Sequence, residues 1–222
     1  MAYLDLIQKI HRKTKRDYLK ERVLGSDKAS CAKIAKKFGK DYWDGDRKYG
    51  YGGYYYDGRW KSLAEKLATR YQLKPGHRVL DVGCGKGYLL YELTQVVPDL
   101  MVHGLDVSRY AIKLGKQEVK ERLLVGNATR LPFKDKTFDL VVSINTLHNL
   151  YIYDLKKAVQ QIERVGKRKS KYIVVDSYRG EREKVNLMYW QLTCECFYTP
   201  KEWEWLLKEY GYTGDLGCIY YE

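Results

Sequence analysis

Glycine occupies alternate positions in the segment VLDVGCGKGYLL, which spans residues 79–90. The glycines are Gly83, Gly85 and Gly87, and a short apolar run that contains Asp81 precedes them. Glycine has no Cβ, so the backbone can approach a ligand closely at such a turn, and the helix that follows directs its first N–H groups at the same ligand. The pattern predicts a strand, a binding loop and a helix, in that order.

The spacing of these glycines and the position of a second acid indicate the kind of ligand. Dinucleotide enzymes favour G-x-G-x-x-G, which cradles a pyrophosphate, whereas this chain has G-x-G-x-G. Asp106 ends the next apolar run roughly 20 residues after the glycines, where a carboxylate can hold ribose hydroxyls. The alternative for Asp106 is a cap on the helix that follows it.

Residues 60–222 alternate between helical and strand patterns. Helices are expected at 60–72, 86–96, 108–118, 154–165 and near 200–210. Strands are expected at 78–82, 100–105, 122–125, 138–144 and 171–176, with a last strand near 216–221. Short apolar runs separated by helices are typical of a parallel sheet that is covered on both faces. Right-handed crossovers then give a Rossmann-like, doubly wound α/β fold with a mostly parallel sheet.

Four segments in this order resemble the class I S-adenosylmethionine-dependent methyltransferases of the UbiE-like type. The glycine segment resembles motif I of that family, and LDVS at 105–108 follows it. GNATRLPF at 126–133 resembles the family's G-D-A-x-x-L-P-F segment, with Asn127 in place of the acid. FDLVVSINTLHNL at 138–150 resembles the family's fourth strand, with its F-D-x-V entry and L-H-H-L-like exit.

The resemblance implies S-adenosylmethionine as cofactor and methyl transfer as the reaction. In the family, the acid at the position of Asn127 meets the adenine amino group, and an amide oxygen can accept that hydrogen bond without a charge. The family usually ends its sheet with an antiparallel extension, so a seventh strand is either missing here or supplied by residues 187–196. The resemblance implies these cofactor-binding residues: Asp81, Gly83, Cys84, Gly85, Gly87, Asp106, Val107, Asn127, Ala128 and Asn145.

Two side chains after the fourth and fifth strands are candidates for acid–base catalysis. His148 is the first, because an unperturbed imidazole titrates near neutral pH; the alternative is a packed turn histidine. Asp176 is the second, and its alternative is a capping or loop acid. A hydroxyl acceptor would need such a base, whereas methyl transfer otherwise depends mainly on in-line placement of the reactants.

Residues 1–59 are expected to form a helical extension with a lid segment. One helix is predicted over 3–24 with Gly25 as its stop, and a second from a Ser26 cap to about residue 38. Residues 40–60 are rich in tyrosine, tryptophan and glycine, which favours an ordered loop or lid over the methyltransferase domain at 60–222. Tyr49, Tyr51 and Tyr54 are candidates to cover the cofactor sulfonium or to bind substrate, and the alternative is that they attach the N-terminal helices to the sheet.

The net charge and the cysteine content indicate which partners and which cellular compartment to expect. The net charge is +13, and residues 1–48 hold 14 Lys and Arg against 7 Asp and Glu, an excess of +7. Such a surface can attract nucleic acid, anionic membranes or phosphorylated small molecules, or it can be a solvated lysine-rich face. Five scattered cysteines indicate reduced thiols and a cytoplasmic location, and Cys194-x-Cys196 lacks the spacing of a zinc site, so no metal is expected. No apolar run approaches the ~20 residues of a membrane span.

The leading hypothesis is a methyltransferase that acts on oxygen or nitrogen of a small molecule. The N/D-P-P-Y motif typical of methylation at exocyclic base nitrogens or glutamine amides is absent after the fourth strand, where Asn145-Thr146-Leu147-His148 stands. A second hypothesis is an RNA or protein methyltransferase that docks its substrate through the basic N-terminal helices. A third is a non-catalytic cofactor-binding module that regulates a partner. The oligomeric state is left open.

Overall fold

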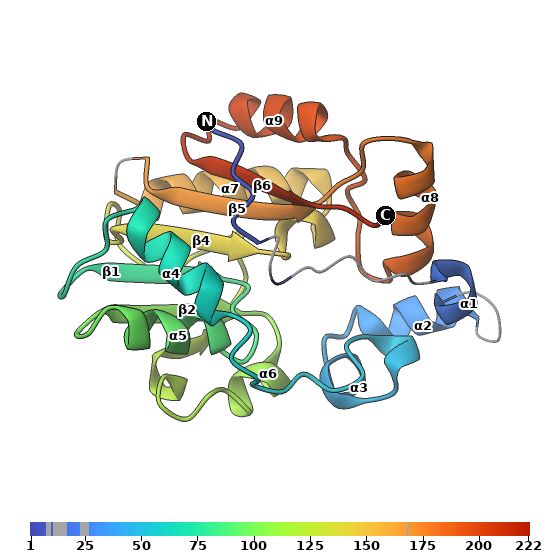
Figure 1. Ribbon diagram of the computed structural model, residues 1–222, viewed down its shortest axis with the longest axis horizontal. Helices are drawn as coiled ribbons and strands as arrows, with labels where there is room; N and C mark the ends of the chain where they lie inside the picture. Colours follow the sequence, from blue (N-terminus) through green and yellow to red (C-terminus); the bar gives the residue numbers. More distant parts are fainter. Residues whose placement is uncertain (8–9, 11–16, 23–26, 168) are drawn as a thin grey trace.

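A computed structural model describes residues 1–7, 10, 17–22, 27–167 and 169–222 of the chain (Figure 1). Its central feature is a 6-stranded sheet in the order β3-β2-β1-β4-β5-β6, in which every pairing is parallel. The strands are β1 Arg78–Val82, β2 Met101–Asp106, β3 Leu123–Val125, β4 Leu140–Ile144, β5 Lys171–Asp176 and β6 Asp215–Ile219. The Rossmann-like α/β fold predicted from the sequence is confirmed.

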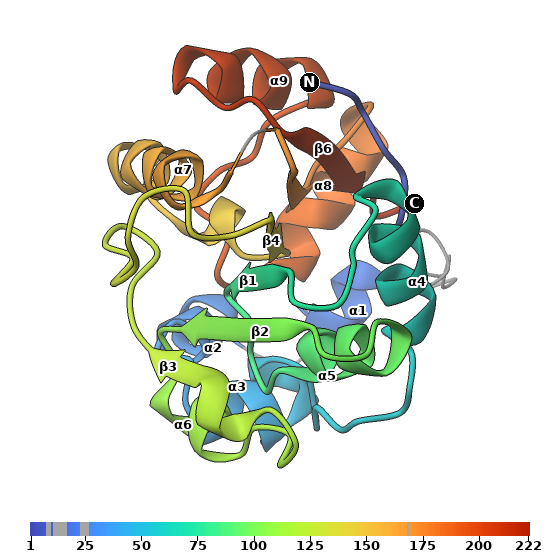
Figure 2. The same ribbon diagram turned by 90° about the vertical axis from the view of Figure 1, so that its left-hand side faces the viewer.

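Helices cover both faces of this sheet (Figure 2). They are α4 Lys61–Arg70, α5 Tyr88–Val96, α6 Arg109–Lys113, α7 Ile152–Val165 and α9 Pro200–Glu209, with 3₁₀ turns η2 Lys120–Arg122 and η3 Leu147–Asn149. Helix α8 Glu181–Trp190 lies beyond the carboxyl ends of the strands (Figure 1). Alternate strand residues enter opposite cores: Val79 packs with α4 and α5, whereas Leu80 packs with α7 and α9. This alternation follows from the period of two along a strand, and it gives the sheet two buried faces.

The sheet edge beyond β6 differs from the expectation. Residues 187–196 supply no strand, because the first four close α8 and the rest of this described segment is irregular. Instead the N-terminal residues add to the edge: Leu4 N donates to Leu216 O at 2.8 Å, and Leu216 N donates to Ala2 O at 2.9 Å. The predicted helix from residue 3 is therefore wrong at its start, since the open edge of β6 offers these backbone groups a hydrogen-bonding partner.

The remaining N-terminal elements lie beyond the carboxyl ends of the strands (Figure 1). They are α1 Tyr18–Arg22, α2 Lys28–Ala35, α3 Lys40–Asp44 and η1 Arg47–Tyr49. Residues 8–9, 11–16 and 23–24 of the predicted 3–24 helix, together with Gly25 and Ser26, lie outside the described residues, and α1 is the part of this prediction that is found as helix. The cap of α2 is Asp27 and not Ser26: its carboxylate accepts hydrogen bonds from Ala29 N at 3.0 Å and Ser30 N at 3.2 Å. Residues 40–60 are mostly irregular, as expected, but begin with the short helix α3.

Candidate active site

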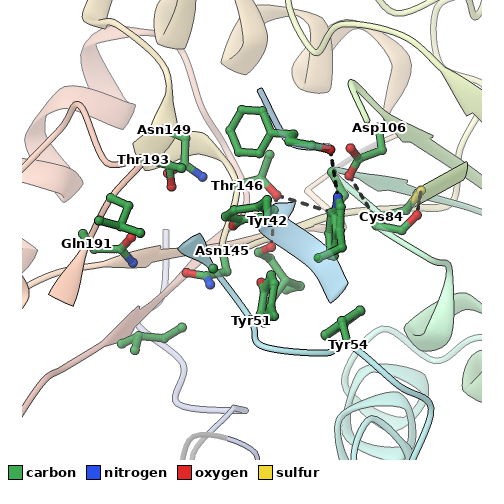
Figure 3. Close-up of a pocket in the computed structure, with 18 of the residues that line it drawn as sticks. Tyr42, Tyr51, Tyr54, Cys84, Asp106, Asn145, Thr146, Asn149, Gln191 and Thr193 are labelled. Carbon is green, nitrogen blue, oxygen red and sulfur yellow. Dashed lines mark hydrogen bonds between the residues drawn. The ribbon is translucent and has the colours of Figure 1, made fainter. Parts of the chain in front are cut away.

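A cavity of about 960 Å³ lies between the carboxyl ends of the strands and the N-terminal elements (Figure 3). It receives side chains from both parts of the chain, so neither part encloses it alone. The predicted site residues that line it are Tyr51, Tyr54, Asp81, Gly83, Cys84, Gly85, Asp106, Val107, Asn127, Ala128 and Asn145. Four predicted residues do not line it: Tyr49, Gly87, His148 and Asp176.

The glycine loop joins β1 to α5 at one end of the cavity. Gly85 has φ +54°, and a Cβ placed there would lie 2.9 Å from the Trp43 ring. Gly87 has φ +75° and is the N-cap of α5, where a Cβ would come within 3.0 Å of Leu123. Both the backbone conformation and the lack of space therefore require glycine. Gly85 faces the cavity, whereas Gly87 has a structural role in packing the helix onto β3.

Two acids from neighbouring strands face this end of the cavity. Asp106 is held by backbone N–H groups, because its Oδ2 accepts from Gly85 N and its Oδ1 from Ser108 N, each at 2.8 Å. Asp81 is 4% exposed, and its Oδ1 has no hydrogen-bond partner in the protein. Burial, together with the charge of nearby Asp106, raises the pKa of Asp81 to about 8. An orphaned, buried carboxyl oxygen of this kind indicates a ligand group that is positively charged or donates hydrogen bonds.

Asn145 borders the same end of the cavity at β4, the strand next to β1 on the side opposite β2. It follows β4 in a left-handed conformation, with φ +57°, and its side-chain Oδ1 is buried without a partner. Strain at a non-glycine residue is common where a side chain must be directed at a ligand. Tyr51 and Asn145 both line the cavity, so this end is bounded by the strand end on one side and by the aromatic segment on the other.

Asn127, Ala128 and Val107 form the rim of the cavity beside β3. The Oδ1 of Asn127 accepts from Thr129 N at 2.9 Å and from Thr129 Oγ1 at 3.0 Å. This local turn fixes the direction of the amide. The adenine contact implied for Asn127 stays a prediction.

Aromatic side chains of residues 38–54 cover the glycine loop. Trp43 stacks on Tyr51 with ring centroids 5.3 Å apart, and Tyr51 lies 4.7 Å from Tyr54. The Trp43 indole donates to Ser108 Oγ at 2.9 Å. Trp43 is absent from the residues predicted from the sequence, although its place between Tyr42 and Asp44 in the same aromatic segment was a signal for it. Tyr49 instead packs beside Cys31 and Ala35, away from the cavity.

Burial raises the pKa of Tyr51 and raises that of Tyr54 well above the ordinary tyrosine value. Both hydroxyls are therefore protonated near neutral pH. They can donate hydrogen bonds to a ligand, and their rings can pack on it, but they are not bases.

His148 and Asp176 lie together behind the cavity wall. His148 is 1% exposed, its Nδ1 accepts from Asp176 N at 3.0 Å, and its Nε2 lies 3.4 Å from Asp176 Oδ2. Burial lowers the pKa of His148, and the Asp176 charge opposes this shift. Both ring nitrogens are thus engaged within the protein, so the geometry suits a positioning role, and the role of a base stays a prediction.

Gln191 separates Asp176 from the cavity. Its Nε2 donates to Asp176 Oδ2 and, at 3.1 Å, to the Tyr221 hydroxyl, and both Gln191 and Tyr221 line the cavity. The neighbouring Thr193 donates to Asn149 Oδ1 at 2.7 Å. No sequence motif marks residues 191–193, and these residues reach the site because they follow α8. They form a polar wall away from the glycine loop.

Comparisons with known proteins agree with this geometry. The family described as "Methyltransferase domain" matches residues 73–211. A demethylmenaquinone methyltransferase of Symbiobacterium thermophilum is 31% identical over 128 residues, which is 54% of this chain and 50% of that protein. A 2-phytyl-1,4-naphtoquinone methyltransferase of Synechocystis is 32% identical over 162 residues, covering 69% of this chain and 66% of that protein. The chain spans about half the length of the first curated relatives that it matches.

The chain belongs to the class I S-adenosylmethionine-dependent methyltransferases. Solved structures support the fold: a methyltransferase of Haloferax volcanii, in complex with the Trm112 activator, has a TM-score of 0.57 at 25% identity and covers 70% of this chain and 73% of its own. The YcgJ protein of Bacillus subtilis has a TM-score of 0.56 at 22% identity, covering 69% and 68%. The family resemblance of the four sequence segments is confirmed.

The residues at the glycine loop fit the methyl donor of this family. The donor has an ammonium group and a sulfonium, both positive, and two ribose hydroxyls. Asp81 Oδ1 and Asn145 Oδ1 are buried oxygens without protein partners, suited to accept from the ammonium group. Asp106 lies beside Gly85, where a carboxylate can accept hydrogen bonds from the ribose hydroxyls.

No described helix is long and apolar enough to cross a membrane.

Proposed function

We propose that the protein transfers the methyl group of S-adenosylmethionine to an oxygen or nitrogen of a small molecule. The observation that carries this proposal is a continuous cavity of about 960 Å³, which runs from the glycine loop to the polar wall at 191–193. Its volume lies in the range of small-molecule sites, about 300–1,000 Å³. The quinone substrates named for the two methyltransferase relatives support a small-molecule acceptor.

The described residues favour catalysis by placement of the two reactants. The bound donor supplies an electrophilic methyl group on a sulfonium. Trp43, Tyr51 and Tyr54 line the cavity above the glycine loop. Holding the acceptor in line with the methyl group can lower the barrier by about 7–11 kcal/mol. The candidate bases His148 and Asp176 lie behind Gln191, so they would act by holding the wall in place.

A basic surface on the N-terminal elements favours a second candidate, a methyltransferase for RNA. Lys33, Lys36, Lys37 and Lys40 are exposed on and after α2. Lysines on one surface attract phosphates, and such binding weakens steeply as salt rises. A small acceptor inside the cavity would show little dependence on salt.

Two further proposals concern the whole chain. We propose that residues 1–59 act as a helical and lid extension of a methyltransferase domain at 60–222, because the cavity needs both. We also propose a cytoplasmic location, since all five cysteines are free thiols, as is usual in a reducing compartment.

The test begins with calorimetric binding of S-adenosylhomocysteine at two salt concentrations. Acceptors are then screened with methyl-labelled donor, first phenols, quinols and amines, then bulk RNA. The proposal predicts transfer to a small molecule at a rate that is unchanged between low and moderate salt. Transfer to RNA alone, lost at moderate salt, would replace it with the second candidate. Cofactor binding with no transfer to any acceptor would favour a regulatory module.

A further inference from the structure

A buried ion pair joins the aromatic segment to the cofactor loop. Lys86 stands between Gly85 and Gly87, yet its side chain turns away from the cavity and is 4% exposed. Its Nζ lies 2.8 Å and 2.7 Å from the two carboxylate oxygens of Asp44, whose side chain is 14% exposed. Removing one partner of such a pair destabilises a protein far more than removing one partner of a surface pair, because the remaining charge stays buried.

Asp44 and Lys86 also hold the backbone of the aromatic segment. Asp44 Oδ1 accepts from Tyr54 N at 3.0 Å, and Lys86 Nζ donates to Tyr54 O at 2.8 Å. The Tyr110 hydroxyl of α6 donates to Asp44 Oδ2 at 3.0 Å. Burial alone would raise the pKa of Asp44, but its hydrogen bonds with Lys86, Tyr54 and Tyr110 outweigh it and lower that pKa. The Asp44 carboxylate thus joins the aromatic segment to the glycine loop and to α6.

The residues on either side of this pair are those that cover the cofactor loop. Trp43 precedes Asp44, and its ring lies over Gly85. Tyr54, held at both its N and its O, stacks on Tyr88 at 5.1 Å. Any movement of the loop at Lys86 is therefore transmitted to the cover, and any opening of the cover must separate two buried charges.

We propose that the Asp44–Lys86 pair is a positioning element for the aromatic cover, which consists of the Trp43 and Tyr54 side chains. The pair holds this cover at the distance from the glycine loop that the bound methyl donor requires. It touches neither reactant and acts through Trp43 and Tyr54. The proposal rests on the donor that family membership provides and not on the identity of the acceptor.

The test compares Asp44→Asn, Lys86→Met and the double variant in the full-length protein. Each single variant leaves one buried charge without its partner and should lower the melting temperature. The double variant removes both charges while its new amide oxygen still accepts from Tyr54 N, so the melting temperature should largely recover. Asp57→Asn is the matched control, because it removes a carboxylate from the same segment where the Asp57–Arg59 pair is exposed.

The deciding measurements are the dissociation constant of S-adenosylhomocysteine and amide hydrogen exchange over residues 43–56. If the pair positions the cover, all three variants bind about tenfold or more weakly, because the cover must be ordered on binding. Exchange over 43–56 then stays faster than wild type even in the stable double variant. Wild-type affinity in the double variant would overturn the proposal and leave the pair a structural role. If the wild-type protein itself fails to bind S-adenosylhomocysteine, the cofactor assignment is refuted. That result differs from the failure of this proposal, in which the wild type and the double variant bind equally well.

Discussion

Replacement of Asp81 by asparagine tests the electrostatics of the cofactor site. With a pKa of about 8, this buried carboxyl is about 90% protonated at pH 7 in the protein without ligand. Ionising it at that pH costs about 1.4 kcal/mol. A positive ligand group at about 4 Å returns about 4 kcal/mol at an effective dielectric constant near 20. Because the attraction exceeds the cost, binding should ionise Asp81 and release its proton.

The assay is calorimetry of S-adenosylhomocysteine binding in buffers of different ionisation enthalpy. At pH 7 the wild-type protein should release about 0.9 proton from Asp81, following the protonated fraction. The ligand's amino group, with a pKa of about 8, is about 90% protonated at pH 7 and can take up only about 0.1 proton beside the ionised carboxyl, so the proton released by the wild-type protein comes mainly from Asp81. Proton release that is equal in the two proteins would refute this account of the site.

The same substitution should stabilise the protein without ligand. The pKa of Asp81 is higher in the folded chain than in the unfolded chain, so between about pH 4 and 8 the unfolded state binds fewer protons, and the free energy of unfolding falls as pH rises. This loss amounts to at most about 4 kcal/mol by pH 7. Asp81→Asn removes it, so the variant should melt higher at pH 7 to 8 while binding more weakly. A lower melting temperature together with unchanged binding would give Asp81 a purely structural role.

Three further predictions concern the neighbouring residues. Asp106→Ala should abolish detectable S-adenosylhomocysteine binding while the far-ultraviolet circular dichroism is retained, and unchanged affinity would remove this acid from the site. Gly85→Val should lose binding and destabilise the loop, since its Cβ would meet the Trp43 ring at 2.9 Å at a φ of +54°; an unaltered dissociation constant would mean that the loop does not approach the ligand. His148→Ala should lower the melting temperature but reduce kcat by less than about tenfold, whereas a loss of about 100-fold or more with a changed pH–rate profile would make it a general base.

Local patterns in the sequence were sufficient for the core of the fold. The strands at 78–82 and 171–176 have the boundaries that were expected, because each is a short apolar run between turn residues and is buried on both faces. The glycine loop was also predictable, since left-handed φ angles and close approach impose glycine whatever surrounds them. The carboxyl ends of parallel strands meet at one edge of the sheet, and this brings Asp81, Asp106 and Asn145 together at the cavity.

The composition of the cavity depended on contacts between distant segments. His148 and Asp176 follow the expected strands, but Gln191, brought in by α8, stands between Asp176 and the cavity. The first residues of the chain form an edge pairing with β6 because that edge was left open, and no local periodicity encodes an open edge.

The sequence by itself determined the backbone framework and the cofactor loop, since strands, turns and glycine conformations follow from sterics within a few residues. Only the tertiary structure decided which side chains enclose the ligand. Asp44 pairs with Lys86, and Trp43 lies over Gly85, because packing brings these two segments together. That packing depends on residues far apart in the chain.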